Sequence, residues 1–222
     1  MRLMRTPKKM DIDITNRCNL RCRYCYHFES SGDAGGDLPA AEWLRFFEEL
    51  NRCAVTEVTL AGGEPFIRED LKEIIEGIVR NRMRFQILSN GTLIDDDAAA
   101  YIASTGRCNY IQVSIDGSMP ASHDVMRGKG SFEKAVEGLR TLRRHRVHAA
   151  VRVTIHRAHV SEGHFELRAY PAAGFNPAHS YRLCVYGRDG QPAACVLTDP
   201  RHLDFSVGDL AAVQEHAPGF QC

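Results

Sequence analysis

The most informative stretch of this 222-residue chain is Cys18-Asn19-Leu20-Arg21-Cys22-Arg23-Tyr24-Cys25. It gathers three of the eight cysteines, whereas the other five are scattered along the sequence. Three thiolates at positions i, i+4 and i+7 can converge on one inorganic centre, and thiolates favour zinc, cuprous copper or iron–sulfur clusters. The stretch therefore predicts a metal centre.

Two kinds of centre are compatible with these cysteines. A structural zinc ion would need a fourth ligand, which His27 could supply, although its usual signature is a pair of Cys-x₂-Cys units. A cubane iron–sulfur cluster with three protein ligands keeps one iron open for a substrate, which is a catalytic arrangement. The single Cys-x₃-Cys-x₂-Cys run favours the cluster, and zinc is the alternative.

Over the first two thirds of the chain, short apolar runs alternate with amphipathic stretches of helical period. This alternation is typical of successive βα units, which build an α/β fold around a parallel sheet. The expected strands are Met10–Thr15, Glu57–Leu60, Arg84–Ser89, Tyr110–Ile115 and Ala149–Ile155. The expected helices are Ala40–Cys53, Asp70–Arg80, Asp95–Thr105 and Ser131–Arg146. We expect Ser131 to open the last helix through a partial capping box.

The first four expected strands run into loops that are rich in Gly, Asn, Asp or Cys. These loops hold Thr15-Asn16-Arg17-Cys18, Ala61-Gly62-Gly63-Glu64-Pro65, Ser89-Asn90-Gly91 and Asp116-Gly117. In α/β sheets and barrels, ligands bind at the carboxyl ends of the strands because the loops there converge on one face. The sequence therefore predicts a single site at this edge of the sheet.

The composition limits the expected partners. The chain is 44% hydrophobic and 25% charged, which suits a globular protein rather than a disordered tail or a coiled coil. Lys plus Arg and Asp plus Glu both number 28, so the net charge gives no reason to expect a nucleic acid or an anionic membrane as partner. No apolar run approaches the roughly 18 residues of a membrane span, and the amino end lacks the apolar stretch of a signal peptide, so we expect a cytoplasmic location.

Three further features have structural explanations. Cys53 and Cys108 are expected to be small buried hydrophobic residues rather than ligands. The basic stretch Arg140–His148 closes an expected helix, whose carboxyl end favours cations through its dipole. We therefore expect this stretch to be a solvated helix face rather than a nucleic-acid site.

Two motifs together resemble those of the radical S-adenosylmethionine (radical SAM) superfamily. The cysteine run has an aromatic residue, Tyr24, before its last cysteine, and Gly62-Gly63-Glu64-Pro65 is similar to the family's GGEP motif. The resemblance covers about residues 8–156. It implies a partial (β/α) barrel in which a [4Fe-4S] cluster on Cys18, Cys22 and Cys25 binds S-adenosylmethionine (SAM). It also implies that an electron from the cluster cleaves SAM, giving a radical that abstracts hydrogen from a substrate.

The same resemblance suggests the residues around SAM. Glu64, placed by Gly62, Gly63 and Pro65, would accept a hydrogen bond from the SAM amino group. Tyr24 would form an aromatic wall beside the adenine.

A second run, from Ser114 to Phe132, is similar to one found in peptide-modifying and sulfatase-maturing members. There the serine contacts the SAM ribose and a later arginine pairs with the SAM carboxylate, and Ser114 and Arg127 match these positions. Arg152 is an alternative partner for the carboxylate. The weaker candidates for contact with the ribose or substrate are Asp116 and Asn90.

After about residue 156 the βα rhythm fails. Expected strands at Phe165–Ala169, Tyr181–Tyr186 and Pro192–Leu197, with the turn signal Arg188-Asp189-Gly190, predict a small antiparallel extension. We therefore expect a core over residues 1–158 and a second unit over residues 159–222.

This extension resembles an abbreviated SPASM or twitch region, in which a cysteine ligates an auxiliary iron–sulfur cluster. Cys195 matches that cysteine, and Cys184 and Cys222 are further candidate ligands. A complete SPASM region carries more cysteines, so we expect either an abbreviated member or an incomplete chain.

The resemblance to peptide-modifying members implies that the protein is a peptide maturase. It would abstract hydrogen from a side chain of a precursor peptide or protein and take electrons from a partner such as flavodoxin or ferredoxin. One alternative is a radical SAM enzyme that acts on a small metabolite. Another is a non-catalytic metal-binding module, such as a zinc-binding protein.

Overall fold

The computed structural model describes residues 6–25, 36–117 and 119–154, and the backbone of three further strands. Those strands are β6 (Glu166–Pro171), β7 (Tyr181–Tyr186) and β8 (Pro192–Thr198). They form an antiparallel sheet in the order β6-β7-β8. The predicted antiparallel extension is therefore confirmed in type, whereas Phe165, the turn at Asp189-Gly190 and Cys222 lie outside the described residues.

The main sheet has five parallel strands in the order β1-β2-β3-β4-β5. They are β1 (Lys9–Thr15), β2 (Glu57–Gly62), β3 (Arg84–Ser89), β4 (Cys108–Ser114) and β5 (Ala149–Arg152). Each strand lies beside its predecessor in the chain, as successive right-handed βα units require. The predicted α/β fold with a partial (β/α) barrel is confirmed.

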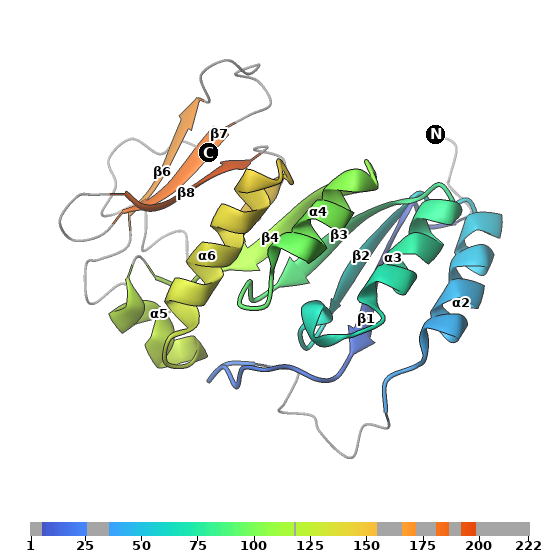
Figure 1. Ribbon diagram of the computed structural model, residues 1–222, viewed down its shortest axis with the longest axis horizontal. Helices are drawn as coiled ribbons and strands as arrows, with labels where there is room; N and C mark the ends of the chain where they lie inside the picture. Colours follow the sequence, from blue (N-terminus) through green and yellow to red (C-terminus); the bar gives the residue numbers. More distant parts are fainter. Residues whose placement is uncertain are drawn as a thin grey trace.

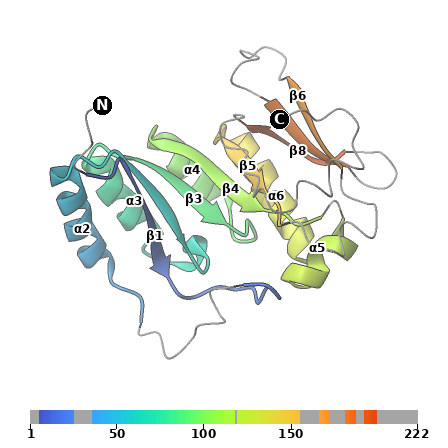
Figure 2. The same ribbon diagram turned by 180° about the vertical axis from the view of Figure 1, so that it is seen from behind.

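Four helices cover one face of this sheet (Figures 1 and 2). They are α2 (Ala40–Arg52), α3 (Leu71–Arg80), α4 (Asp96–Ser104) and α6 (Ser131–Arg144). The shorter elements are the 3₁₀ turn η1 (Pro65–Ile67) and α5 (Pro120–Arg127). None of the described helices is long and apolar enough to cross a membrane.

The two faces of the sheet differ in chemistry. Strand side chains alternate between faces, and Leu60, Ile87 and Ile111 are fully buried in the core with the apolar side chains of the helices. Thr59 and Gln86 point to the opposite face, where the Gln86 amide donates to the Thr59 hydroxyl over 2.8 Å. The helix-covered face is therefore an apolar core, and the other face is polar.

The start of α6 differs from the prediction. Gly130, not Ser131, is the N-cap residue, and the cap is supplied from α5. The Asp124 carboxylate accepts the backbone N–H groups of Gly130 at 2.6 Å and Phe132 at 2.9 Å. The predicted capping box at Ser131 is wrong because Ser131 is the first residue of the helix, and its hydroxyl donates to the Gly128 carbonyl over 2.6 Å instead of accepting a helix N–H.

The structural predictions for Cys53, for Cys108 and for the basic stretch at the end of α6 have different outcomes. Cys53 is exposed at the carboxyl end of α2, so its predicted burial is wrong. Cys108 packs against the core, and burial raises the pKa of its thiol to about 12. Arg140, Arg143 and Arg144 are exposed at the end of α6, as expected for a solvated helix terminus.

Candidate functional site

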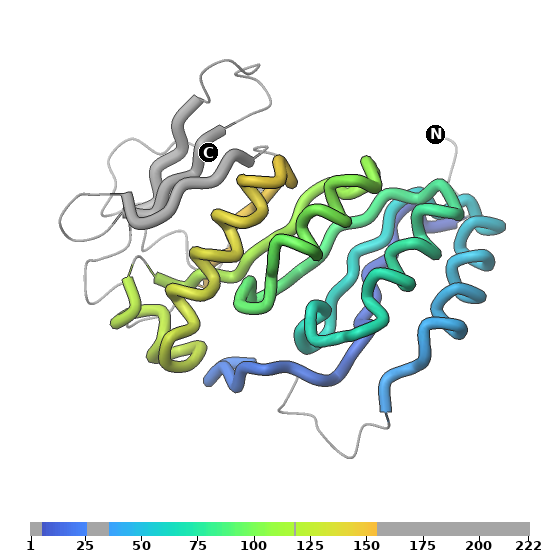
Figure 3. The backbone as a smooth tube through the Cα atoms, in the orientation of Figure 1, coloured from blue at the N-terminus to red at the C-terminus, as the bar shows by residue number. Residues whose placement is uncertain are grey.

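The three cysteines lie on one loop that follows β1 and runs towards α5 (Figure 3). We call residues 16–25 the cysteine loop. The Leu20 N–H donates to Cys18 Sγ over 3.4 Å, and the Cys25 N–H donates to the Cys22 carbonyl over 3.2 Å. All three cysteines are free thiols of intermediate exposure.

The thiols fit an iron–sulfur cluster by donor chemistry. Burial and the neighbouring thiols raise the pKa of Cys18 and Cys22, although the Leu20 N–H and the charge of Arg127 act in the opposite direction. Ligation must therefore displace protons, as is usual for cysteine metal sites. Three thiols are the ligand set of a cubane with one open iron.

The zinc alternative would use the same three cysteines together with His27. In the described parts of the chain, no three His, Cys, Asp or Glu side chains are gathered closely enough to hold one metal ion. His27, its proposed fourth ligand, lies outside those parts.

The glycine-glutamate turn after β2 supports the cysteine loop directly. Gly63 N–H donates to the Thr15 carbonyl and Glu64 N–H donates to the Arg17 carbonyl, each over 2.8 Å. A Cβ on Gly63 would lie 2.1 Å from the Arg17 oxygen, so only glycine permits this approach. Gly62 has φ +119°, a conformation that glycine tolerates.

Glu64 is buried beneath this turn with an exposed fraction of 0%. Its carboxylate accepts hydrogen bonds from the Ser89 hydroxyl at 2.8 Å, the Asn90 N–H at 2.7 Å and the Phe66 N–H at 3.2 Å. Burial nevertheless raises the pKa of Glu64 to about 7. Pro65 begins the 3₁₀ turn that positions the Phe66 donor.

Asn90 connects the end of β3 to the cysteine loop. Its amide nitrogen lies 3.7 Å from Cys18 Sγ and donates to Asn19 Oδ1 over 2.9 Å. Its amide oxygen accepts from the Thr92 N–H and hydroxyl at 2.9 and 2.7 Å. In this structure Asn90 therefore supports the cysteine loop.

Asp116 lies just beyond β4 and is the most highly connected carboxylate of the site. It is 0% exposed and pairs with Arg127, with 2.5 Å between Nε and Oδ2. It also accepts the Tyr24 hydroxyl and the Thr154 N–H, the latter at 2.9 Å. Burial alone would raise the pKa of Asp116, but the charge of Arg127 and these hydrogen bonds lower it.

The remaining predicted residues that the structure describes lie on other strands of the fold. Ser114 ends β4 and is half-buried, and Arg152 is exposed at the paired position of β5. Cys184 and Cys195 occupy directly paired backbone positions on β7 and β8, while Cys222 is outside the described residues.

Sequence reasoning missed two polar side chains around the start of the cysteine loop, Arg68, which is buried, and Asp37, which is half-buried. Arg68 donates to the Ile14 carbonyl over 2.6 Å and to the Leu38 carbonyl over 2.9 Å, and it pairs with Asp70. Asp37 accepts hydrogen bonds from Thr15 and from the following two residues at 2.8 to 3.1 Å. The only sequence signal for either residue was its position beside a motif.

Comparison with known sequences identifies the family. The pattern described as "Radical SAM superfamily" matches residues 12–162. The chain is 34% identical over 152 residues to pre-heme d1 synthase of Dinoroseobacter shibae, covering 68% of this chain and 37% of that protein. It is 32% identical over 130 residues to the mycofactocin maturase MftC of Mycobacterium ulcerans, covering 59% of this chain and 35% of that protein.

A third relative extends over the whole chain. The PqqA peptide cyclase of Granulibacter bethesdensis is 24% identical over 220 residues, covering 99% of this chain and 59% of that protein. The chain thus spans between about a third and three fifths of the length of these relatives.

The fold is also found among solved structures. The structure titled "Native anSMEcpe with bound AdoMet" matches with a TM-score of 0.63 at 19% identity, covering 71% of this chain and 46% of that chain. This likeness supports the barrel architecture around the cysteine loop. From the family match and the cysteine and glycine-glutamate motifs that the fold brings together, the chain belongs to the radical SAM superfamily.

Proposed function

We propose that this chain is the core of a radical SAM enzyme that abstracts hydrogen from a side chain of a peptide or protein. The observation that carries the proposal is the direct attachment of the glycine-glutamate turn to the end of β1 and the start of the cysteine loop, through 2.8 Å hydrogen bonds to the Thr15 and Arg17 carbonyls. Two relatives bear names of peptide-modifying enzymes, a mycofactocin maturase and a PqqA peptide cyclase.

Cys18, Cys22 and Cys25 would hold a [4Fe-4S] cluster. When bound, this cluster and SAM supply one-electron cleavage of the sulfonium and a carbon radical that removes hydrogen from the substrate. The protein's own contribution is to hold the three thiols at one end of the sheet and to keep their surroundings partly buried. Partial burial limits the access of water and stray electron acceptors to such a centre.

Two groups near the cysteine loop suit the charged ends of SAM. Glu64 would accept a charge-assisted hydrogen bond from the SAM ammonium, and an approaching cation would favour ionisation of this buried carboxyl. Arg127 has Nη1 beside the cysteine loop and is the first candidate for the SAM carboxylate. Arg152 is the second candidate.

The other predicted SAM contacts follow from position. Ser114 at the end of β4 would contact the ribose, and the Tyr24 ring would lie beside the adenine. The contacts of Asn90 and Asp116 with protein groups favour supporting roles for both residues.

The proposal has further parts that concern the whole protein. Residues 1–158 would form the radical SAM core, and residues 159–222 a twitch-like unit in which Cys184, Cys195 and Cys222 supply ligands to an auxiliary cluster. A reductant such as flavodoxin or ferredoxin would deliver the electron. A cytoplasmic location agrees with the free thiols among the described residues, because reducing compartments keep cysteines unpaired.

A second candidate substrate is a tetrapyrrole. The relative with 34% identity is named pre-heme d1 synthase, a higher identity than that of the two peptide-modifying relatives. A tetrapyrrole would be one example of the small metabolites named above as an alternative substrate.

Anaerobic reconstitution with iron and sulfide tests the cluster. We expect a brown protein with at least four irons per chain, and the Cys18/Cys22/Cys25→Ala triple variant should lose four of them together with the colour they give. Cys53→Ala is the matched control, because this cysteine is exposed at the carboxyl end of α2 and is not part of the cysteine loop. A colourless wild-type protein that retains zinc would refute the proposal. Additional iron that is lost in Cys195→Ala would support the auxiliary cluster.

Turnover assays test the proposed SAM cleavage and hydrogen abstraction. Dithionite and SAM should yield 5′-deoxyadenosine and methionine with the wild-type chain and not with the triple variant. Hydrogen abstraction from a candidate precursor peptide, followed with deuterated side chains, should place deuterium in 5′-deoxyadenosine. Deuterium transfer from a tetrapyrrole and not from peptides would instead favour the second candidate.

A further inference from the structure

Asp116 joins four separate parts of the chain at one buried carboxylate. It lies just beyond β4, and its donors are Arg127 at the end of α5, Tyr24 in the cysteine loop and the Thr154 N–H beyond β5. Its own N–H donates to His123 Nδ1 over 3.1 Å. A carboxylate that is 0% exposed and accepts donors from three directions leaves little freedom to any of them.

The geometry fixes the orientation of the Arg127 guanidinium. Nε lies 2.5 Å from Asp116 Oδ2 and Nη2 lies 3.4 Å from Asp116 Oδ1, so two of its three nitrogens face the carboxylate. The third, Nη1, lies 4.0 Å from Cys22 Sγ. The guanidinium carbon is also 5.6 Å from the centre of the Tyr24 ring, which Asp116 holds by its hydroxyl.

The backbone contact between α5 and the cysteine loop does not depend on Asp116. The Arg23 N–H donates to the Met126 carbonyl over 2.9 Å. Loss of the Asp116 carboxylate would therefore release the Arg127 side chain while this attachment of the loop remains.

We propose that Asp116 is a positioning residue, which aims the Arg127 guanidinium at Cys22 and so holds a cation beside one ligand of the cluster. This inference rests on the proposed function, because it requires a cluster on the cysteine loop. It assigns Asp116 a role through Arg127 and Tyr24 rather than through contact with ribose or substrate.

A cation at this place has a definite effect on the cluster. Reduction adds negative charge to the cluster, and nearby charges and hydrogen bonds to its sulfurs set the reduction potential. A fixed cation near Cys22 favours the reduced state and raises the potential. Asp116 itself is an anion, so loss of its charge with Arg127 still in place would also raise the potential, whereas loss of the Arg127 position would lower it.

The test is a redox titration of the reconstituted full chain without SAM, followed by electron paramagnetic resonance of the reduced cluster. Arg127→Gln should lower the midpoint potential. Asp116→Asn should also lower the midpoint potential. The new amide N–H₂ faces groups that are themselves donors, so Arg127 loses its fixed position beside Cys22. A higher potential in Asp116→Asn than in the wild type would overturn the proposal, and so would an unchanged potential.

The control is Asp124→Asn. Asp124 is also a carboxylate of α5 that accepts backbone N–H groups, but its partners are at the start of α6. Its substitution should leave the potential unchanged. A shift equal to that of Asp116→Asn would mean that any disturbance of α5 suffices, which contradicts the positioning role.

A conservative variant covers the case in which Asp116→Asn does not fold or take up a cluster. Asp116→Glu keeps the charge and moves the carboxylate by one methylene. The positioning role therefore predicts a lower potential, whereas a role of the charge alone predicts no shift of the potential. Iron content separates this result from failure of the proposed function. A wild-type chain without a cluster removes the proposed function, whereas four irons with no shift in Asp116→Glu removes only the role of Asp116.

Discussion

Gly63 lies so close to Arg17 that a Cβ built on the glycine would be 2.1 Å from the Arg17 carbonyl oxygen. The turn after β2 therefore packs directly against the start of the cysteine loop. We expect Gly63→Ala to push the loop away, to destabilise the fold by about 1–3 kcal/mol and to reduce iron uptake on reconstitution. Iron content per chain and urea unfolding of the apo protein measure the two effects.

Gly36→Ala is the control for this prediction. A Cβ added at Gly36 would have no neighbour within 4 Å, so the new methyl group has nothing to displace. Iron uptake should match that of the wild type. Equal iron content in Gly63→Ala and the wild type would show that the close approach is not needed to hold the loop.

Glu64 should make the stability of the fold depend on pH. Burial raises its pKa from 4.5 to about 7. Between these values the folded chain keeps a proton that the unfolded chain releases, so stability falls as the pH rises from about 4.5 to about 7 and then levels off. Full ionisation costs about 3 kcal/mol at 1.36 kcal/mol per pKa unit.

Glu64→Gln removes this titration. The difference in free energy of unfolding between pH 5 and pH 7, measured with urea, should be smaller in the variant than in the wild type. Asp116 does not interfere, because its pKa is lowered and its stabilising effect is lost only as the pH falls below the ordinary range for aspartate. Parallel pH profiles of the two proteins would contradict the prediction.

Arg68 should matter far more to stability than an exposed arginine. Its side chain is 3% exposed, and it donates to the Ile14 and Leu38 carbonyls besides pairing with Asp70. Arg68→Met removes the donor to the buried Ile14 carbonyl and the bond to the Leu38 carbonyl, which should cost about 2–4 kcal/mol in urea unfolding.

Arg80→Met is the matched comparison. Arg80 pairs with Glu76 one helical turn away, and both side chains are more than half exposed. Such pairs contribute roughly 0.5 kcal/mol or less. If the two substitutions cost the same, burial of Arg68 is not what makes it important.

The sequence was most informative where apolar period or turn chemistry is strong. The helix predicted over Asp70–Arg80 is α3 (Leu71–Arg80), with Asp70 as its N-cap residue, and the strand predicted over Tyr181–Tyr186 is β7. For α3, local side-chain pattern and tertiary packing agree, because Leu71, Ile74, Ile75 and Ile78 are buried. The cysteine and glycine-glutamate motifs were also predictive, since the spacing of each reflects a local backbone requirement.

Long-range polar partnerships left no such signal. Asp116 and Arg127 stand 11 positions apart, at the end of a strand and the end of α5, a helix of 8 residues that was not predicted. That helix is held by its partners rather than by an apolar stripe, so periodicity could not reveal it. Likewise, the acceptor that opens α6 comes from Asp124 in another helix, which local capping rules do not anticipate.

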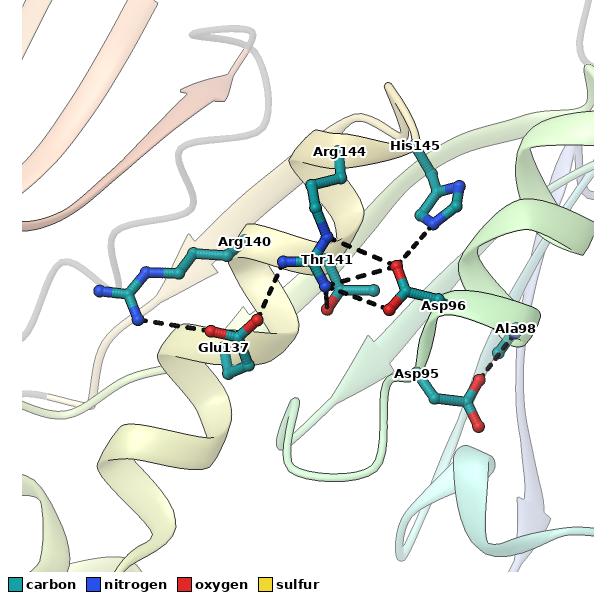
Figure 4. Close-up of polar contacts among 8 residues, drawn as sticks. All are labelled: Asp95, Asp96, Ala98, Glu137, Arg140, Thr141, Arg144 and His145. Carbon is teal, nitrogen blue, oxygen red and sulfur yellow. Dashed lines mark hydrogen bonds and ion pairs between the residues drawn. The ribbon is translucent and has the colours of Figure 1, made fainter.

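The neighbouring residues Asp95 and Asp96 should differ in their importance for α4. Asp95 is the N-cap residue and accepts the Ala98 N–H over 2.7 Å, whereas Asp96 contacts Arg144 and His145 at the end of α6 (Figure 4). The N-cap satisfies a backbone donor that no other group in the helix can reach, so Asp95→Ala should cost about 1 kcal/mol.

The contacts of Asp96 are more numerous, but they lie on the solvated surface, where water competes for each of them. Asp96→Ala should therefore destabilise the fold less than Asp95→Ala, and only its effect should shrink when urea unfolding is repeated in 1 M salt. A larger loss for Asp96→Ala that persists in salt would show that the pairing of α4 with α6, rather than the cap, holds this helix in place.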